Sequence, residues 1–396
     1  MSRRGSGVPT HGSNLYTTAA IVNPYPHYRT LRELGPVVWL SRHRVYALPR
    51  YTDCKAVLRD DKTFISGKGV ALNPLTNRLS RGTTLSSDGA EHDHRRKLVA
   101  HRLLPRALRA IEDDVRRQAA RVVDSALARG EVDGVEDLAY ALPMAVVPDL
   151  IGWPRDQRTD LLPWGAATFD VLGPINRHAV RSLTASLRML AYARRVVRER
   201  SLIEGSVGHE VLMAADAGTV DLAECAPLMI DYIAPSLDTT ISAISNALHL
   251  FACHPEQWQL LKADPGLIPN AVNEIVRYES PLRAFTRKVR TSTEVAGHSI
   301  PQGARVLVLY SSANRDEREW DAPDSFDITR DATRQLGFGH GAHACAGQGL
   351  ARLETHAMLG ALVERVERIE LSGTPTWAIN NIIRRHERLP LKLMAS

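Results

Sequence analysis

The sequence contains few cysteines, four in 396 residues, and no two of them form a CxxC pair. This scarcity argues against a zinc site or a disulfide framework and suits the reducing cytoplasm. No uninterrupted apolar run of about 18 residues occurs, so we expect neither a membrane span nor a secretion signal. Internal repeats and Gly/Ser linkers are absent too. We therefore expect one domain over residues 1–396 that begins with a flexible segment, residues 1–20.

A large charge excess is also missing. The chain has 50 Lys and Arg against 44 Asp and Glu, a net charge of +6, and a pI of about 9.2. Acidic partners are steered towards a basic protein. The basic residues are nevertheless spread along the chain among acidic ones, and no nucleic-acid-binding motif occurs. We therefore expect no nucleic-acid partner and favour an acidic redox protein.

The patterns that are present predict many helices and little sheet. Residues 23–36 read as a short helix that stops at Gly35-Pro36, and the β-prone runs 37–40 and 45–48 flank a hairpin turn. Residues 88–204 are mainly helical, with Gly130 as a stop signal. A β-like stretch covers residues 293–316, and another helix is expected from about residue 347 to about residue 367. The expected class is mainly α with a small β-rich region.

One long helix is expected from residue 221 to about residue 253. Its apolar residues recur at spacings of four, three, four and three, at Leu237, Ile241, Ile244, Leu248 and Phe251. That spacing places them on one face of a helix. The helix therefore turns an apolar stripe towards a core.

The most informative segment is LGFGHGAHACAGQGLARLE, residues 336–354, with the pattern FxxGxxxCxGxxxA at Phe338, Gly341, Cys345, Gly347 and Ala351. Glycines let a tight loop approach a flat ligand closely, and a helix follows the cysteine at once. Backbone N–H groups and the helix dipole would stabilise a thiolate there. The plainer alternative, a small buried hydrophobic cysteine, does not explain the five positions together.

This loop resembles the cysteine-ligand loop of the cytochrome P-450 family, and residues 23–36, 313–330 and 389–393 fall in the family's order. The resemblance implies a P-450 fold, with haem b held between the long central helix and the cysteine loop and with Cys345 as the iron ligand. It implies a monooxygenase that uses O2. By the same resemblance, electrons would come from NAD(P)H through a ferredoxin reductase and a ferredoxin.

A second motif lies in the long helix, where residues 234–240 read APSLDTT. It resembles the family's oxygen-activation segment, so Asp238 and Thr239 are implied to be the acid and alcohol that deliver protons during catalysis. Pro235 and Ser236 depart from the small residues usual there. Because proline removes a backbone donor and clashes with the carbonyl of Asp231, we expect the helix to open at that point.

A structural motif matches the family as well. Glu274 and Arg277 stand at the ExxR spacing, which lets them pair on one helical turn. By the resemblance a later arginine, Arg330, completes the network and locks the loop that leads to the cysteine. Arginine forks suit such partly buried networks.

Four side chains are implied to hold the two haem carboxylates. His92 and Arg96 share one helical face, Arg287 comes from a β-prone run, and His343 adjoins Cys345. Phe338 and Gly347 of the loop would also contact the cofactor. Other basic residues near His92, namely Arg95, Lys97 and Arg102, are expected to stay exposed, and some of them to dock the ferredoxin.

For the substrate, the sequence resembles bacterial members that oxidise para-substituted benzoic acids by removing an aryl methoxy methyl group. If so, Phe169, Leu172 and Phe285 would pack an aromatic ring over the haem. A carboxylate would meet Arg78 or Arg81.

Asp231 and Pro235 would line the same pocket from the long helix, and Asp231 argues against an acidic substrate. A neutral phenol ether or a terpenoid-like molecule then gains weight. The alternatives are natural-product, terpenoid or steroid hydroxylation within the family, a peroxide-driven enzyme, and, outside enzymes, a haem-thiolate sensor or binding protein. The presence of Asp238 and Thr239 disfavours the last two.

Overall fold

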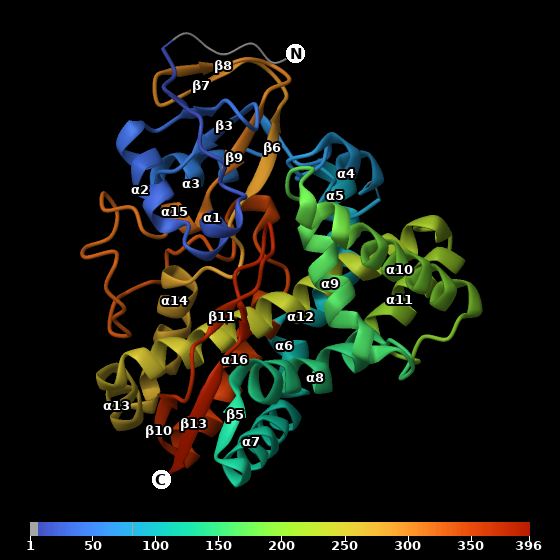
Figure 1. Ribbon diagram of the computed structural model, residues 1–396. Coiled ribbons are helices and arrows are strands. Elements are labelled where there is room, and N and C mark those ends of the chain that lie inside the picture. Colours follow the sequence, from blue (N-terminus) through green and yellow to red (C-terminus); the bar gives the residue numbers. More distant parts are fainter. Residues whose placement is uncertain (1–6, 81) are drawn as a thin grey trace.

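The computed structural model describes residues 7–80 and 82–396. Helices account for 54% of the chain and strands for 12%, so the predicted class, mainly α with a small β-rich region, is confirmed. Figure 1 shows a larger sheet at one end of the molecule and a smaller sheet at the other, with helices between and around them.

The larger sheet has six strands in the order β1-β2-β3-β9-β6-β4. The predicted hairpin is present, since β2 and β3 pair antiparallel with Trp39 opposite Tyr46. Strand β9 then joins β3 in parallel, which ties the second half of the chain to the first. The strands are β1 (Thr10–His11), β2 (Val38–Leu40), β3 (Val45–Leu48), β4 (Phe64–Ile65), β6 (Phe285–Val289) and β9 (Arg305–Val308).

The start of the described chain differs from the expected flexible segment. Thr10 and His11 pair with β2 as strand β1. Val8, Leu15 and Tyr16 are buried. Residues 8–20 are therefore held in place, because their apolar side chains cover the outer part of the sheet.

Four helices and a small hairpin pack near this sheet. The predicted helix within residues 23–36 is α2 (Tyr25–Leu34), and it is joined by α1 (Thr18–Val22), α3 (Tyr51–Arg59) and α15 (Tyr310–Ala313). Strands β7 (Thr293–Val295) and β8 (His298–Ile300) form the hairpin. The β-like interpretation of residues 293–316 thus holds through β9 and is wrong for α15. There the chain turns back, and Asn314 accepts the Leu336 N–H through its side chain.

The middle of the chain is helical, as predicted. The longest of these helices before α12 are α7, which ends at Gly130 in the left-handed region with φ 73°, and α10. The α-helices are α4 (Pro74–Leu79), α5 (Gly89–Ala100), α6 (Pro105–Leu108), α7 (Glu112–Arg129), α8 (Ala141–Ile151), α9 (Leu161–Asp170), α10 (Arg177–Glu199), α11 (Val207–Asp216), α13 (Pro255–Ala263) and α14 (Ile268–Tyr278). Shorter helical turns are η1 (His101–Leu103), η2 (Gly134–Tyr140), η3 (Arg158–Asp160), η4 (Pro265–Leu267) and η5 (Gly341–His343).

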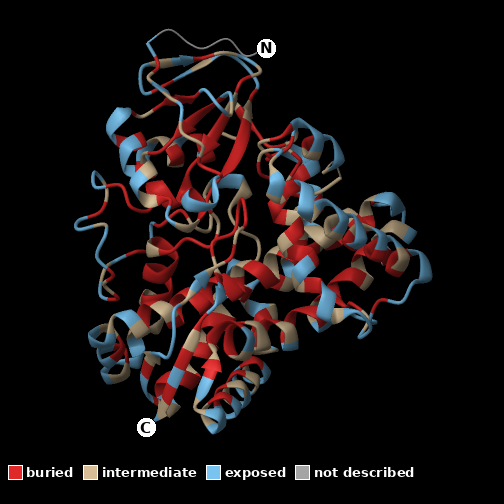
Figure 2. Ribbon diagram, in the orientation of Figure 1, coloured by how far each residue is buried: buried red, intermediate tan, exposed pale blue. Residues whose placement is uncertain are grey.

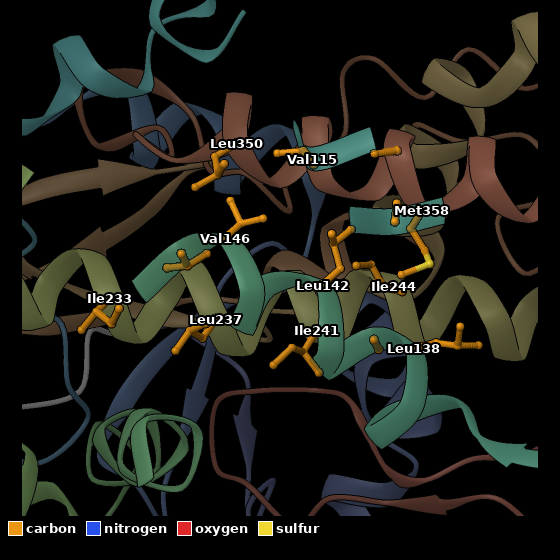
Figure 3. Packing of buried hydrophobic residues seen from close by; sticks show 14 of the residues in the cluster. Val115, Leu138, Leu142, Val146, Ile233, Leu237, Ile241, Ile244, Leu350 and Met358 are labelled. Carbon is orange, nitrogen blue, oxygen red and sulfur yellow. The ribbon is translucent and has the colours of Figure 1, made fainter. Parts of the chain in front are cut away.

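The long central helix is α12 (Leu222–Cys253). Asp221 caps its start by accepting the Ala223 N–H, and all five residues of the predicted apolar stripe are buried. Figure 3 shows Ile233, Leu237 and Ile241 of α12 among side chains of η2, α8 and α16. Burial on one continuous face is what stabilises so long a helix.

Pro235 does not open this helix, which corrects the expectation. Helix α12 runs without a break past both Pro227 and Pro235. A proline removes one hydrogen bond, but Leu237 and Ile241 beyond it are fully buried, so packing holds the axis in place.

The smaller sheet lies at the opposite end and contains the C-terminal strand. Strand β13 (Pro390–Ala395) pairs with both β10 (Val366–Leu371) and β5 (Glu131–Asp133), while β11 (Thr376–Trp377) and β12 (His386–Arg388) form a separate hairpin. Helix α16 (Gln348–Arg365) leads into β10. Figure 2 shows buried residues concentrated along α12, α16 and the larger sheet, so the core surrounds the region between helix and cysteine loop.

Candidate active site

The cysteine loop is shaped by glycines and hydrogen bonds. Gly339 and Gly341 adopt φ of 71° and 72°, a region that side chains disfavour. The Cys345 N–H donates to the Phe338 carbonyl at 2.8 Å, which closes the loop. A Cβ at Gly341 would lie 2.4 Å from the Leu58 carbonyl oxygen of α3. The loop is therefore pressed against α3 where only glycine fits.

The sulfur of Cys345 meets the start of α16. Burial raises the pKa of the thiol, while the backbone N–H groups of Gly347 and Gln348 hydrogen-bond the sulfur and lower it, as do the nearby Arg96 and Arg352. The expected N–H groups aimed at the sulfur are thus present. A bound metal cation would lower the pKa of the thiol further, in addition to these N–H groups and arginines. This environment therefore suits a metal-bound thiolate better than a free one.

A cavity of about 200 Å³ opens between the cysteine loop and α12. Its lining is mainly apolar. A Cβ built on Gly347 would lie 4.0 Å from Ser236 Oγ, so the loop and the helix approach each other at the edge of this cavity. Fourteen of the residues singled out from the sequence line this cavity: His92, Arg96, Phe169, Asp231, Pro235, Ser236, Thr239, Phe285, Arg287, Phe338, His343, Cys345, Gly347 and Ala351.

Cationic and imidazole groups gather at one part of the cavity wall. The His92 and His343 rings lie 4.3 Å apart between centroids. Arg96 donates to the Ala342 carbonyl at 3.1 Å, and Arg287, only 4% exposed, donates to the carbonyl of Thr286. Burial, together with the charges of Arg287, His92 and Arg96, lowers the pKa of His343 to about 3.

These groups fit the carboxylates of haem b. Among the described residues no carboxylate pairs with Arg96 or Arg287, and the buried Nε2 of His92 has no hydrogen-bond partner. Buried cations and donors without partners are costly. An anionic ligand at this wall would satisfy all of them, so the residues present fit the cofactor.

Helix α12 presents a spaced row of residues to the cavity. Asp231, Pro235 and Thr239 follow at intervals of four and therefore share one face. The Thr239 hydroxyl donates to the Pro235 carbonyl at 2.6 Å. Asp238 does not line the cavity. It is fully buried, and its Oδ1 accepts from Arg385 Nε at 2.8 Å.

The remaining oxygen of Asp238, Oδ2, is buried without a hydrogen-bond partner. Burial raises the pKa of Asp238, and Arg385 lowers it. Arg385 in turn approaches Glu387, whose side chain is 62% exposed, at 3.5 Å. Asp238 and Thr239 are thus adjacent in the sequence, but the Asp238 carboxylate pairs with Arg385 and does not face the cavity.

The substrate residues divide into two groups. Phe169 from α9 and Phe285 from β6 both line the cavity, and Tyr310 stands edge-on to Phe285 at 6.4 Å. Leu172 does not line it, because it is packed in the adjoining core and its carbonyl accepts the Leu72 N–H. Arg78 is exposed on α4 and away from the cavity. Arg81 lies outside the described residues.

The structure brings the ExxR residues and Arg330 together. Arg277 forms a two-point pair with Glu274, at 2.6 and 2.8 Å, and both side chains are completely buried. Arg330 Nε lies 3.3 Å from the same carboxylate. Arg277 also donates to the carbonyls of Asn314, Pro323 and Ser325. The cluster therefore fixes the segment that leads to the cysteine loop.

The expectation of an exposed basic surface on α5 needs correction. Arg95 is buried, because it bridges Glu91 and Glu224, each at 2.6 Å. Arg102 is paired with Glu210. Only Lys97 of the three is exposed without a described ion pair.

Sequence reasoning missed several lining residues. Thr84 and Tyr232 reach the cavity, and Arg385 reaches Asp238. Tyr232 adjoins Asp231 in the sequence, so its position was a usable signal, whereas Thr84 lies in a loop without a motif. Arg385 lies 147 residues from its partner, and nothing in the sequence indicates that contact.

A cysteine sulfur that faces an apolar cavity beneath a long helix, with cations along one wall, is the arrangement expected of a haem-thiolate protein. Comparison with known proteins gives the family. The family model described as Cytochrome P450 matches residues 266–388. CYP199A2 of Rhodopseudomonas palustris is 36% identical over 396 residues, with 99% of this chain and 96% of that protein covered.

Other similar proteins extend the comparison. The epothilone C/D epoxidase of Sorangium cellulosum is 31% identical, with 94% of this chain and 93% of the relative covered. The structure of cytochrome P450 CREJ in complex with (4-ethylphenyl) dihydrogen phosphate matches with a TM-score of 0.88 at 27% identity, covering 97% of this chain and all of that one. The chain therefore belongs to the cytochrome P450 family.

As a member it is a cytochrome P450 monooxygenase with haem b as its cofactor. It uses O2 and redox partner proteins and acts on small organic substrates. Over the described residues, none of the helices combines the length and the apolarity needed to span a bilayer.

Proposed function

We propose that this enzyme hydroxylates or O-demethylates a small aromatic compound, with electrons from NAD(P)H delivered by a ferredoxin reductase and a ferredoxin. The observation that carries the proposal is the pair Phe169 and Phe285, which line one apolar cavity from two different elements. Two such rings suit a flat aromatic substrate. The complex of CREJ with an ethylphenyl phosphate is consistent with a small aromatic ligand in this fold.

The cavity favours a phenol ether over a benzoate. Of the two arginines expected to meet a carboxylate, Arg78 is exposed away from the cavity. The described cations that line the cavity, Arg96 and Arg287, lie with His92 and His343. Asp231 lines the wall formed by α12. A carboxylate substrate would therefore meet an acid.

When bound, haem b supplies oxygen activation at its iron. In this proposal Cys345 holds the iron as a thiolate, and the start of α16 stabilises the negative sulfur. Phe338 and Gly347 of the cysteine loop would contact the cofactor on either side of Cys345. The two cofactor carboxylates are held by His92, Arg96, Arg287 and His343.

Asp238 and Thr239 handle protons in this proposal. The Thr239 hydroxyl lies at the cavity and can reorient from the Pro235 carbonyl to donate into it. Asp238 exchanges protons with solvent on the side of Arg385 and Glu387 and passes them on by side-chain rotation. Arg385 is a positioning residue, because it acts through Asp238.

Reconstitution tests this function. The holoenzyme is supplied with NADH, a ferredoxin reductase, a ferredoxin and 4-methoxyphenyl compounds, and formaldehyde is measured against NADH consumed. We expect formaldehyde in proportion to substrate, and none when the ferredoxin is omitted. Equal rates with a flavodoxin in place of the ferredoxin contradict the partner, and NADH use without any oxidised aromatic product contradicts the substrate class.

A second candidate is hydroxylation of a larger natural product, terpenoid or steroid. Its support comes from proteins similar to this one rather than from the size of the cavity. One relative is an epothilone epoxidase, and CYP109E1 from Bacillus megaterium, solved with testosterone, matches with a TM-score of 0.85. If a spin-state titration gives a lower Kd for testosterone than for any methoxyphenyl compound, this candidate is favoured.

The same proposal treats the chain as one domain in the cytoplasm. Strand pairing of β9 with β3 and of β13 with β5 joins distant parts of the chain. All four cysteines are unpaired, which suits a reducing compartment.

A further inference from the structure

A carboxylate in an apolar substrate cavity needs an explanation. Asp231 lines the cavity from α12, and no ion pair to it occurs within residues 7–80 and 82–396. The charge of Arg95 lowers the pKa of Asp231, but Arg95 is already held by Glu91 and Glu224. An unpaired charge in an apolar cavity is costly. A carboxylate of this kind in a cleft is a candidate binding site for a cation.

The surroundings of Asp231 hold the carboxylate in place. Its Oδ2 accepts the Leu85 N–H at 3.0 Å, and Thr84 donates to it as well. These are neutral donors from the loop before α5, so they fix the side chain without cancelling its charge. The hydroxyl of Tyr232, near Thr84 Oγ1 at 3.5 Å, is the neighbouring titratable group on α12.

Pro235 adds a second acceptor at the same place. Since proline has no N–H, the carbonyl oxygen of Asp231 lacks the donor that the helix would otherwise supply four residues on. Asp231 therefore offers both a carboxylate and a carbonyl oxygen. Of the cations that line the cavity, neither Arg96 nor Arg287 forms an ion pair with Asp231 in the described chain.

The position of Asp231 also sets a length. Thr239 is eight residues further along α12 and lines the same cavity. Eight residues span roughly 12 Å of helix. A molecule that touches Asp231 while exposing a carbon near Thr239 must therefore be on the order of 10 Å long.

We infer that Asp231 receives a protonated amine of the substrate, so that the enzyme oxidises aromatic compounds with a basic nitrogen roughly two helical turns (~11 Å) from the oxidised carbon. This inference rests on the proposed aromatic function and specifies the far end of its substrate. The substrate inferred here is a cation, whereas the resemblance to benzoate-oxidising members implies an anionic substrate.

Three probes with one ring and one methoxy group test it: 3-(4-methoxyphenyl)propylamine, 3-(4-methoxyphenyl)propan-1-ol and 3-(4-methoxyphenyl)propanoate. Each is titrated into the ferric holoenzyme at pH 8, and the low-spin to high-spin shift gives Kd. We expect the amine to bind at least about tenfold more tightly than the propanoate, with the alcohol between them. The shorter 4-methoxybenzylamine should bind more weakly than the propylamine.

The variant Asp231→Asn keeps acceptors for Leu85 and Thr84 but removes the charge. We expect it to lose the preference for the amine, whereas Glu210→Gln, on α11 outside the cavity, keeps it. Wild-type protein gives an independent measurement if the variant binds no haem. Burial raises the pKa of Asp231 to about 6, so amine binding should weaken as pH falls through about 6.

The outcomes separate the inference from the function. A propanoate that binds as tightly as the amine, an amine preference that survives in Asp231→Asn, or the absence of a high-spin shift with every amine overturns the inference. A shift towards low spin, from nitrogen on iron, overturns it too. Amine preference without formaldehyde refutes the demethylation alone, and rapid demethylation of the propanoate refutes the inference alone.

Discussion

Replacement of Arg385 by glutamine is the sharpest perturbation of the proton-handling residues. Asp238 is fully buried, and Arg385 is its only cationic partner in the described chain, with Nε–Oδ1 at 2.8 Å. Removing one member of a buried ion pair costs about 3–5 kcal/mol if the other stays charged. Asp238 can limit that cost by taking up a proton, because burial already raises its pKa.

We therefore expect Arg385→Gln to be less stable by about 3 kcal/mol at neutral pH, with a lower Tm. The loss should shrink in acid, where Asp238 is protonated in both proteins. With Asp238 neutral at pH 7, the product formed per NADH should fall on the order of tenfold, while the CO-bound reduced spectrum stays unchanged. Thermal unfolding from pH 4 to pH 8 and coupled turnover measure the two effects.

Arg388→Gln is the matched control. Arg388 lies three residues further on, is 73% exposed and is 3.6 Å from Asp133. An exposed pair contributes less than about 1 kcal/mol, so neither stability nor coupling should change. If Arg385→Gln unfolds and couples like wild type at every pH, the assignment of Arg385 and Asp238 is refuted.

Four further changes probe other parts of the site. Cys345→Ser should remove the strongly red-shifted Soret band of the reduced CO complex, and a retained band would exclude Cys345 as the ligand. Arg277→Ala should cost about 3–5 kcal/mol or more, because Glu274 is left buried and unpaired, and should yield little haem protein by absorbance. Arg287→Ala should speed haem transfer to apomyoglobin, since a buried cation at the carboxylate wall is lost. Asp231→Asn should be more stable than wild type by about 3 kcal/mol above pH 6 and equally stable below about pH 4, because wild type must ionise a carboxyl whose pKa is raised to about 6. Urea unfolding across that range would show a constant difference if the charge were unimportant.

Local sequence patterns predicted the parts of the fold that depend on neighbours in the chain. The stripe from Leu237 to Phe251 gave the long helix, and the loop around Cys345 gave the position of the cavity. Gly130 ended α7 as expected. These features follow from periodicity and backbone conformation, which are readable over short windows.

Contacts between distant residues could not be read in this way. Arg385 pairs with Asp238 across 147 residues, and Arg95 is buried by Glu224. Pro235 was expected to break the helix from local rules, but tertiary packing overrides them. Leu172 has the residue type of a pocket wall and is part of the adjoining core instead.

The close contact between Gly341 and the Leu58 carbonyl has a consequence for how molecules enter. The cysteine loop is packed between α3 and α16, so the side of the cavity that carries the sulfur has little freedom to move. Leu79, an exposed apolar side chain, stands on α4, a helix whose one buried residue is Asn77, so few buried contacts resist its displacement. Substrate entry and product release should therefore depend on movement of α4, while the cysteine loop that binds the metal keeps its position.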